Sequence, residues 1–219
     1  MLPLSEHTLD YLSPDFYHFS EDSIHLARMV SDEISSLTGQ LHILDLCAGQ
    51  GVVGLEIIQA HPQKNIFLDF CELLEEFRPY LEKNRKHFLT EDKLFKSRIL
   101  IQPLSSLLVP DFQDQWDVVV ANPPYYHPDH FSLSPKSVLK NHCRFFIRDS
   151  FEIFYETLAY ILRPKGKAFF TLLKDGAPNH QKVLNKIREN FIKDHGEKVK
   201  IEQKGEGGGA LIFVMTSLE

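Results

Sequence analysis

The fold of this chain is decided by residues 42–51, which read HILDLCAGQG. The first five of these residues form an almost continuously apolar run, which is typical of a strand buried on both faces of a sheet. Gly49 and Gly51 then allow a tight turn and a close approach of the backbone to a ligand, because neither carries a Cβ atom. A helical pattern follows from about Val52. The stretch therefore predicts a strand, a glycine turn and a helix, which is the repeating unit of parallel α/β sheets.

Short apolar runs alternate with helical patterns over the rest of the chain. The further strand candidates are 65–70, 98–102, 116–121 and 167–173, and the helix candidates span about 52–60, 73–88, 145–162 and 179–193. The last two strand candidates, 198–203 and 210–216, are joined by the glycine-rich residues 204–209, which indicate a hairpin. We therefore predict an α/β fold with a mostly parallel, seven-stranded sheet that ends in an antiparallel hairpin.

The domain organisation is predicted to be simple. A chain of 219 residues suffices for one sizeable core but hardly for two, and we find no repeat or linker that would divide it. We therefore expect a single domain over residues 1–219, with residues 1–40 as a helical lead-in. Within that lead-in, Ser20 is a good N-cap for a helix that reaches about Leu37.

Composition excludes several classes of protein. Hydrophobic residues at 43% and charged residues at 25% are ordinary for globular chains. No run approaches the roughly 20 apolar residues that cross a bilayer, and the N-terminus does not resemble a signal peptide. The three cysteines are widely spaced, which argues against disulfides and zinc. We read residues 127–130, HPDH, as a solvated loop rather than a metal site. The expectation is a cytoplasmic protein without membrane or metal partners.

The glycine turn has the features of a cofactor loop. A residue that binds a ribose diol is expected at the end of the next strand, and Glu72 fits that place better than Asp69, which lies inside the apolar run. Asp45 begins the motif, and a carboxylate there repels phosphates but suits a cationic ligand. The loop therefore favours S-adenosylmethionine, with its sulfonium and ammonium groups, over a nicotinamide dinucleotide. The alternative is a glycine turn that only connects a strand to a helix.

A second motif, Asn122-Pro123-Pro124-Tyr125, directly follows the strand candidate 116–121. The two prolines make the loop rigid, so the Asn122 side-chain oxygen and the Pro123 carbonyl can accept hydrogen bonds from one NH2 group. Tyr125 offers a flat face on which a planar amide or purine can stack. Two fixed acceptors stabilise the positive charge that grows on a nitrogen as it is methylated. The alternative is a proline-rich turn in which Tyr125 only packs.

With both motifs considered, the chain resembles the class I S-adenosylmethionine methyltransferases of the N-P-P-Y type. It is most similar to the bacterial tRNA1(Val) adenine-N6 methyltransferases, over the span from residues 16–22, FYHFSED, to residues 166–170, GKAFF. The resemblance implies a Rossmann-like fold and places Asp22 near the methionine part of the cofactor. The sequence departs from the family pattern in two places. Cys47 replaces a usual glycine, and residues 102–106, QPLSS, lack the acid that often binds the cofactor's adenine in this family. Ser105 or a backbone carbonyl would then have to bind the adenine.

Three acceptors fit the second motif, namely adenine in RNA, adenine in DNA and a glutamine side chain of a protein. Only 44 residues precede Asp45, and we find no insertion that could read a DNA groove, so RNA, in particular tRNA, is the expected partner. Net charge is −6, but residues 1–109 hold 9 basic and 16 acidic residues while residues 110–219 hold 15 and 14. Four basic residues in the second half are spaced by four, as on one helix face, and they either contact phosphates or form a solvated face.

The predicted site has three parts. The catalytic residues are Asn122, Pro123 and Tyr125; the cofactor-binding residues are Asp22, Asp45, Cys47, Gly49, Gly51, Glu72, Ser105 and Asn122; and the substrate-binding residues are Pro124, Tyr126, Lys136, Lys140, Arg144 and Arg148. No metal ligand is predicted. The expected activity is adenine-N6 methylation of structured RNA, with protein glutamine methylation and a catalytically inactive cofactor-binding protein as the alternatives.

Overall fold

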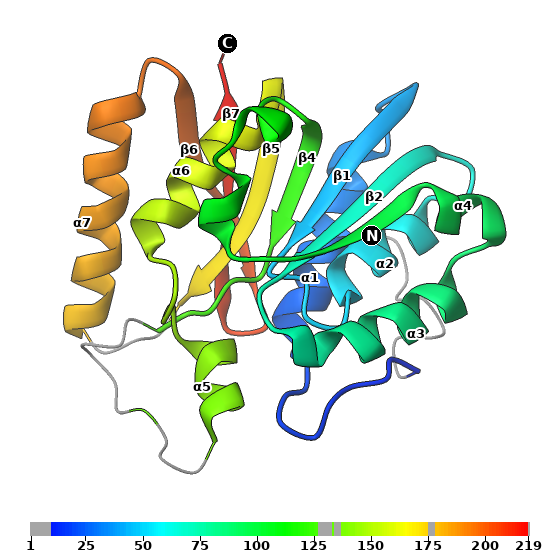
Figure 1. Ribbon diagram of the computed structural model, residues 1–219. Coiled ribbons are helices and arrows are strands. Elements are labelled where there is room, and N and C mark those ends of the chain that lie inside the picture. The colour runs from blue at the N-terminus through cyan, green and yellow to red at the C-terminus, as the bar shows by residue number, and fades with distance from the viewer. Residues whose placement is uncertain (1–9, 127–132, 134–136, 175–177, 219) are drawn as a thin grey trace.

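The computed structural model describes residues 10–126, 133, 137–174 and 178–218. Within this part of the chain, the centre is a seven-stranded sheet with the order β3-β2-β1-β4-β5-β7-β6 (Figure 1). The strands are β1 Gln40–Leu46, β2 Asn65–Glu72, β3 Ser97–Ile101, β4 Trp116–Ala121, β5 Leu162–Leu173, β6 Val199–Gly207 and β7 Ala210–Ser217. Paired strands are parallel except that β7 is antiparallel to both β5 and β6. The predicted fold class is therefore confirmed.

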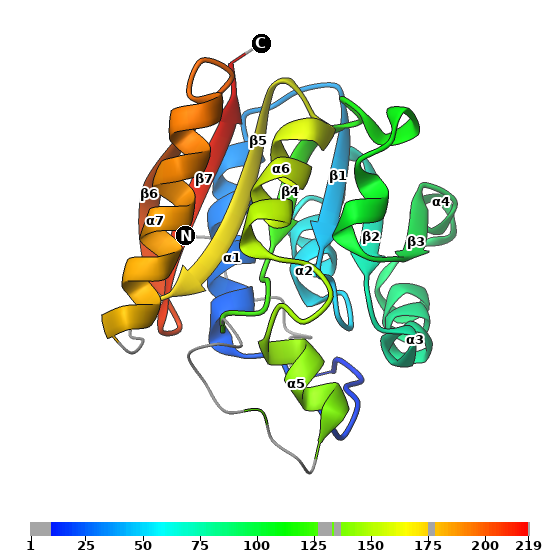
Figure 2. The ribbon, with the colours of Figure 1, turned by 60° about the vertical axis from the view of Figure 1, so that its left-hand side comes forward.

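Helices cover both faces of the sheet (Figures 1 and 2). On one face lie α1 Glu21–Ile34, α2 Val52–Ala60 and α3 Arg78–Phe88, and on the other lie α6 Phe151–Ile161 and α7 Pro178–His195. The short helix α4 Glu91–Phe95 precedes β3, and α5 Val138–Arg144 lies beyond the edge of the sheet at which β1, β4 and β5 end. Three 3-10 turns are Glu75–Phe77, Leu104–Leu107 and Pro110–Phe112. Both faces of the central strands are thus removed from water, which explains their nearly continuous apolar sequence.

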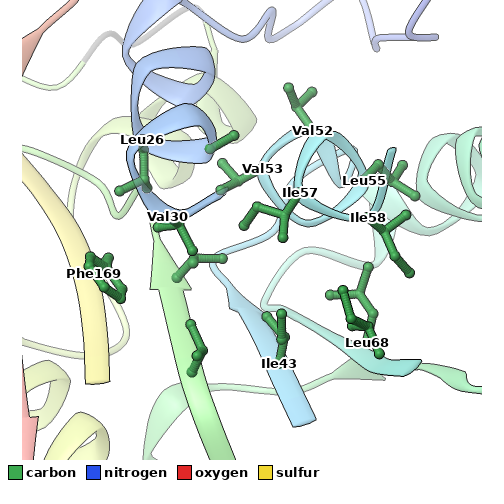
Figure 3. Packing of buried hydrophobic residues seen from close by; sticks show 14 of the residues in the cluster. Leu26, Val30, Ile43, Val52, Val53, Leu55, Ile57, Ile58, Leu68 and Phe169 are labelled. Carbon is green, nitrogen blue, oxygen red and sulfur yellow. The ribbon is translucent and has the colours of Figure 1, made fainter. Parts of the chain in front are cut away.

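The packing of α1 fixes the position of its first turn relative to the sheet. Leu26 and Val30 on α1 and Ile57 on α2 lie in one cluster with Ile43 of β1 and Phe169 of β5 (Figure 3). All five side chains are buried. Each such burial contributes about 1.5–3 kcal/mol relative to leaving the side chain in water. The apolar face of α1 therefore holds the N-terminal end of that helix close to the ends of β4 and β5.

The register of the sheet gathers the predicted site residues. Leu46 of β1 pairs with Cys71 of β2 on one side and with Ala121 of β4 on the other. The next residues, Cys47 and Asn122, consequently leave the sheet side by side. In an open α/β sheet, ligands bind beyond the carboxyl ends of the strands where the strand order reverses, and here that point lies between β1 and β4.

The predicted helix over 145–162 is only partly correct. The structure places a bend before α6, because Phe145 forms a parallel bridge with Tyr126 instead of continuing a helix. The helix then begins after Ser150, whose hydroxyl accepts a hydrogen bond from the Ile153 amide at 3.3 Å. The segment before α6 and α6 itself both bury phenylalanines, so the spacing of apolar residues alone did not reveal the break between them.

The predicted hairpin is present, but its turn is shorter than the predicted loop over 204–209. β6 continues to Gly207, and the turn consists of Gly208 and Gly209, both with left-handed backbone angles of φ 60° and 85°. Gly208 packs directly against the start of α1. A Cβ atom on Gly208 would overlap the Asp22 backbone nitrogen and lie 2.7 Å from the Asp22 Cα. The hairpin turn therefore supports the first turn of α1.

The two turn glycines provide a matched test of that support. Alanine at either position adopts a left-handed conformation at a cost of about 1–2 kcal/mol. Gly208→Ala should also incur an overpacking cost of about 1–3 kcal/mol, whereas a Cβ on Gly209 meets nothing within 4 Å. We expect urea unfolding to show the larger loss of stability for Gly208→Ala. Equal losses for the two variants would mean that the contact with Asp22 contributes nothing.

Candidate functional site

A pocket lies beyond the carboxyl ends of β1 to β4 and is bordered on its outer side by α5 and the segment that follows it. It encloses about 650 Å³ of empty space, part of which is open to solvent. Six of the predicted site residues line it, namely Cys47, Gly49, Glu72, Asn122, Pro124 and Arg148.

Glu72 is held in place by the glycine loop. Its Oε2 accepts a hydrogen bond from the Gly49 amide at 2.8 Å, and its Oε1 accepts one from the Leu74 amide at 2.9 Å. Burial raises the pKa of Glu72, and these amide hydrogen bonds counteract the rise. Each carboxylate oxygen keeps a further lone pair that could accept from a diol. The loop and Glu72 thus form one preorganised unit at the pocket wall.

Asp45 lies beneath this loop rather than in the pocket wall. Only 1% of its surface is exposed, and its Oδ2 accepts a hydrogen bond from the Gly54 amide at 2.8 Å. Burial raises the pKa of Asp45 to about 8, so the group is largely protonated at neutral pH. The attraction of a cationic ligand by Asp45 stays a prediction; in the structure its carboxyl group binds the Gly54 amide in the first turn of α2. Gly51 serves packing, since its Cβ would lie 2.5 Å from Leu81 Cδ1.

All three cysteines of the chain, Cys47, Cys71 and Cys143, line the pocket and are free thiols. Cys47 adopts a left-handed backbone angle of φ 58° in the position where a glycine is usual. Burial raises the pKa of each thiol, which keeps it in the weakly reactive, protonated form. The sequence offered no reason to place these residues together.

The Asn122–Tyr125 loop is tied to α1 and β5 by a polar network. Tyr125 donates its hydroxyl proton within a cluster that contains Asp22 Oδ2, Asn122 Oδ1 at 2.6 Å and Thr171 Oγ1 at 3.1 Å. Thr171 donates to Asn122 Oδ1 at 2.5 Å, and Asn122 Nδ2 donates to Ser23 Oγ at 2.8 Å. Burial and the Asp22 carboxylate raise the pKa of Tyr125 well above its usual value. Its hydroxyl therefore stays protonated.

This network differs from the predicted grip in two respects. The Asn122 side-chain oxygen already accepts hydrogen bonds from hydroxyl groups, and Tyr125 does not line the pocket. Asp22 also lies outside the pocket lining. Its Oδ1 accepts hydrogen bonds from Ser20 Oγ and from the Ser23 amide. Buried polar groups bind one another where they can. Thr171 and Ser23 were not predicted, although the pairing of Ala121 with Phe170 places Thr171 beside Asn122.

The predicted basic stripe is not one helix face. Helix α5 carries Lys140 and Arg144, both exposed, but it ends at Arg144, so Arg148 lies in the following bend. Lys136 and residues 127–130 lie outside the described residues. The Arg144 guanidinium stacks 4.9 Å from the centre of the Tyr126 ring, and its backbone oxygen accepts from the Tyr126 amide at 2.9 Å. Tyr126 therefore anchors α5 to the end of the Asn122–Tyr125 loop.

Ser105 is exposed and does not line the pocket. Its amide instead donates to Asp149 Oδ1 at 3.4 Å, and the neighbouring Leu104 amide donates to Asp149 Oδ2 at 2.9 Å. Asp149 itself lines the pocket, as do Gln102 and His142. Sequence reasoning chose none of these three residues. It searched for an acid only in the turn after β3, which contains Gln102 but neither Asp149 nor His142.

The pattern of residues matches a known protein family. The family model described as Eco57I restriction-modification methylase matches residues 34–205, which span β1 to most of β6. The chain belongs to this family. No curated protein matches the sequence significantly.

Solved structures of methyltransferases share the fold of this methylase. A precorrin-6y C5,15-methyltransferase from Geobacter metallireducens matches with a TM-score of 0.57 and 12% identity, over 96% of this chain and 95% of that chain. A Methanococcus maripaludis protein assigned as an S-adenosyl-L-methionine-dependent methyltransferase matches with a TM-score of 0.57 and 10% identity, over 90% and 87%. TrmN from Thermus thermophilus matches with a TM-score of 0.54 and 18% identity, over 90% of this chain but 48% of TrmN. At these identities the likeness is one of fold.

Two kinds of feature are absent from the described residues. No helix there is long and apolar enough to span a membrane. In the same part of the chain, no group of three or more histidine, cysteine, aspartate or glutamate side chains is arranged to hold a metal ion.

The buried Asp45 predicts a specific pH dependence of stability. The unfolded chain loses this proton near pH 4, whereas the folded protein keeps it until about pH 8. Unfolding therefore releases a proton between these values, and stability should fall with rising pH by at most about 1.4 kcal/mol per pH unit from this group. Asp45→Asn keeps an acceptor for the Gly54 amide and removes the titration.

Urea unfolding of the parent protein and of Asp45→Asn between pH 5 and pH 8 measures this effect. The difference in stability should grow in favour of the variant as the pH rises. The exposed Asp111, changed to Asn, is the control and should give a constant difference. A constant difference for Asp45→Asn as well would mean that Asp45 is ionised in the folded protein.

Proposed function

We propose that this methylase is an S-adenosylmethionine-dependent methyltransferase that acts on the exocyclic amine of adenine in structured RNA, most specifically tRNA. The observation that carries the proposal is the position of Asn122 at the carboxyl end of β4, in the wall of the pocket that Gly49 and Glu72 also line. Methylase family membership and the methyltransferase fold support the reaction class. The RNA acceptor rests on the chemistry of the site and on the charges beside it.

The pocket residues fit the cofactor. Glu72 offers two oriented carboxylate oxygens for a ribose diol, and Gly49 leaves the space that a Cβ would occupy. Two side-chain nitrogens in the pocket lining, Gln102 Nε2 and His142 Nδ1, are buried without a hydrogen-bond partner. Such groups are costly unless a ligand satisfies them. The bound cofactor supplies an electrophilic methyl group on sulfur.

Asn122 orients the acceptor amine in this proposal. Its side-chain oxygen is held in position by the rigid proline pair and by Thr171. An adenine amine has two N–H groups, and one of them would replace the Tyr125 hydroxyl as donor to Asn122 Oδ1. Asn122 Oδ1 then accepts the same number of hydrogen bonds as before. The oxygen stabilises the charge that develops on nitrogen in the transition state, in an environment where such stabilisation is large.

Tyr125 must release Asn122 for this exchange. Without substrate, the Tyr125 hydroxyl binds Asp22 of α1 and Thr171 of β5. Once Tyr125 releases Asn122, its ring would be free to stack on the base, as predicted from the sequence. Because the base must leave its stack to reach Asn122, an unpaired adenine in an RNA loop is a cheaper substrate than one in a duplex.

The charge distribution at the pocket mouth agrees with a nucleic-acid acceptor. Lys140, Arg144 and Arg148 are exposed on and after α5, next to the pocket. Cations in this position attract a phosphate backbone. This attraction weakens as the salt concentration rises. A glutamine side chain in a protein would gain no comparable benefit.

Asn122→Ala should separate cofactor binding from catalysis. We expect kcat to fall by about 100-fold or more, because one fixed acceptor of the transition-state charge is lost. The dissociation constant of S-adenosylhomocysteine should remain close to that of the parent protein. Tyr125→Phe is the matched control, since it removes a hydroxyl from Asn122 Oδ1 but keeps the ring, and it should retain kcat within about tenfold. Comparable losses of kcat in both variants would argue against the role given to Asn122.

The acceptor is identified with cofactor that carries a labelled methyl group. Incubation with total RNA, DNA and protein from a strain that lacks the gene should give label in RNA, at N6 of adenine after digestion to nucleosides. Label in protein or in DNA alone would refute the RNA acceptor. Cofactor binding without transfer to any of the three pools would refute the catalytic proposal.

A further inference from the structure

The turn after β3 is completed by an acid from a distant part of the chain. Asp149 lies in the bend between α5 and α6, 45 positions from Leu104 in sequence, yet its Oδ2 accepts from the Leu104 amide at 2.9 Å. Its Oδ1 accepts from the Ser105 amide at 3.4 Å. These two hydrogen bonds fix the carboxylate against the turn, in the lining of the pocket.

Gln102 occupies the first position of the same turn. Its backbone N–H donates to the Glu72 backbone carbonyl at 2.9 Å. This hydrogen bond fixes the Gln102 backbone beside the residue expected to bind the ribose. Its side chain lines the pocket, and its Nε2 is buried without a hydrogen-bond partner. An unpaired buried donor in a pocket is available to an acceptor on a bound ligand.

The two side chains form a complementary pair for one kind of base. A carboxylate that accepts two amide hydrogen bonds retains lone pairs for a further donor, and Gln102 Nε2 is a donor that lacks an acceptor. Adenine offers the matching edge, with its N6 amine as donor next to N1 as acceptor. Hypoxanthine offers the reverse, with O6 as acceptor next to an N1–H donor. Leu74, Leu104 and Phe146 supply apolar surface for a flat ring in the same pocket.

We propose that Asp149 and Gln102 together bind the Watson–Crick edge of the cofactor's adenine. Asp149 accepts from the N6 amine, and Gln102 Nε2 donates to N1. Asp149 thereby replaces the acid that is absent from residues 102–106. The inference rests on the cofactor of the proposed function and is independent of the methyl acceptor.

The test compares two ligands by calorimetry, S-adenosylhomocysteine and S-inosylhomocysteine. The parent protein should prefer the adenosyl compound by about tenfold or more, since a site built for one hydrogen-bonding pattern rejects its reverse. Asp149→Asn should weaken binding of the adenosyl compound by about tenfold to 100-fold and leave the inosyl compound unchanged or bound more tightly. The double variant Asp149→Asn with Gln102→Glu should prefer the inosyl compound.

Controls separate recognition of the base from loss of structure. Glu152→Gln removes the same charge from an exposed position three residues away and should keep the parent's preference. The ratio of the two affinities within one variant is insensitive to partial unfolding, which lowers both alike. An unchanged ratio in Asp149→Asn and in the double variant would overturn the inference. If the parent protein binds neither compound, the proposed cofactor is wrong instead.

Discussion

The pairing of β1 with β4 is the constraint on which the rest of the site depends. These strands are far apart in sequence, but their parallel register sets Leu46 opposite Ala121. The glycine loop and the Asn122–Tyr125 loop must therefore leave the sheet at the same level, one on each side of the point where the strand order reverses. Neither motif could place a cofactor beside a methyl acceptor by itself. The apolar residues of β1 and β4, buried on both faces, set this register and so determine the geometry of the chemistry.

Elements outside this strand pair make the arrangement rigid. The hairpin turn at Gly208 supports the first turn of α1, which in turn presents Asp22 and Ser23 to the Asn122–Tyr125 loop. The polar network joins α1, β4 and β5 at one point, since Thr171 of β5 also binds Asn122. The C-terminal hairpin therefore forms one edge of the sheet and also supports the Asn122–Tyr125 loop through a chain of direct contacts. A site that must orient a methyl acceptor beside a cofactor benefits from such support.

The sequence was sufficient wherever the signal is local. Apolar runs, glycine turns and caps predicted the strands, the hairpin and the pocket-lining residues Gly49, Glu72 and Asn122, because each depends on neighbours in the chain. It was insufficient where tertiary contacts decide. Asp45 is acidic in the motif, but its burial beneath the loop, which raises its pKa, depends on the packed fold. Asp149 could not be found by searching the turn after β3, because only the fold brings it there.

Charge is divided between the two sides of the pocket, and this division follows from the two demands on the site. The inner side carries carboxyl groups held by backbone amides, such as Glu72 and Asp149. Amide hydrogen bonds stabilise these groups without introducing a cation that would repel a positively charged ligand. The outer side, on and after α5, carries exposed cations such as Lys140 and Arg148. For a protein with a net charge of −6, such a local surface is where the polyanion that we propose as the methyl acceptor would approach, directly beside the pocket.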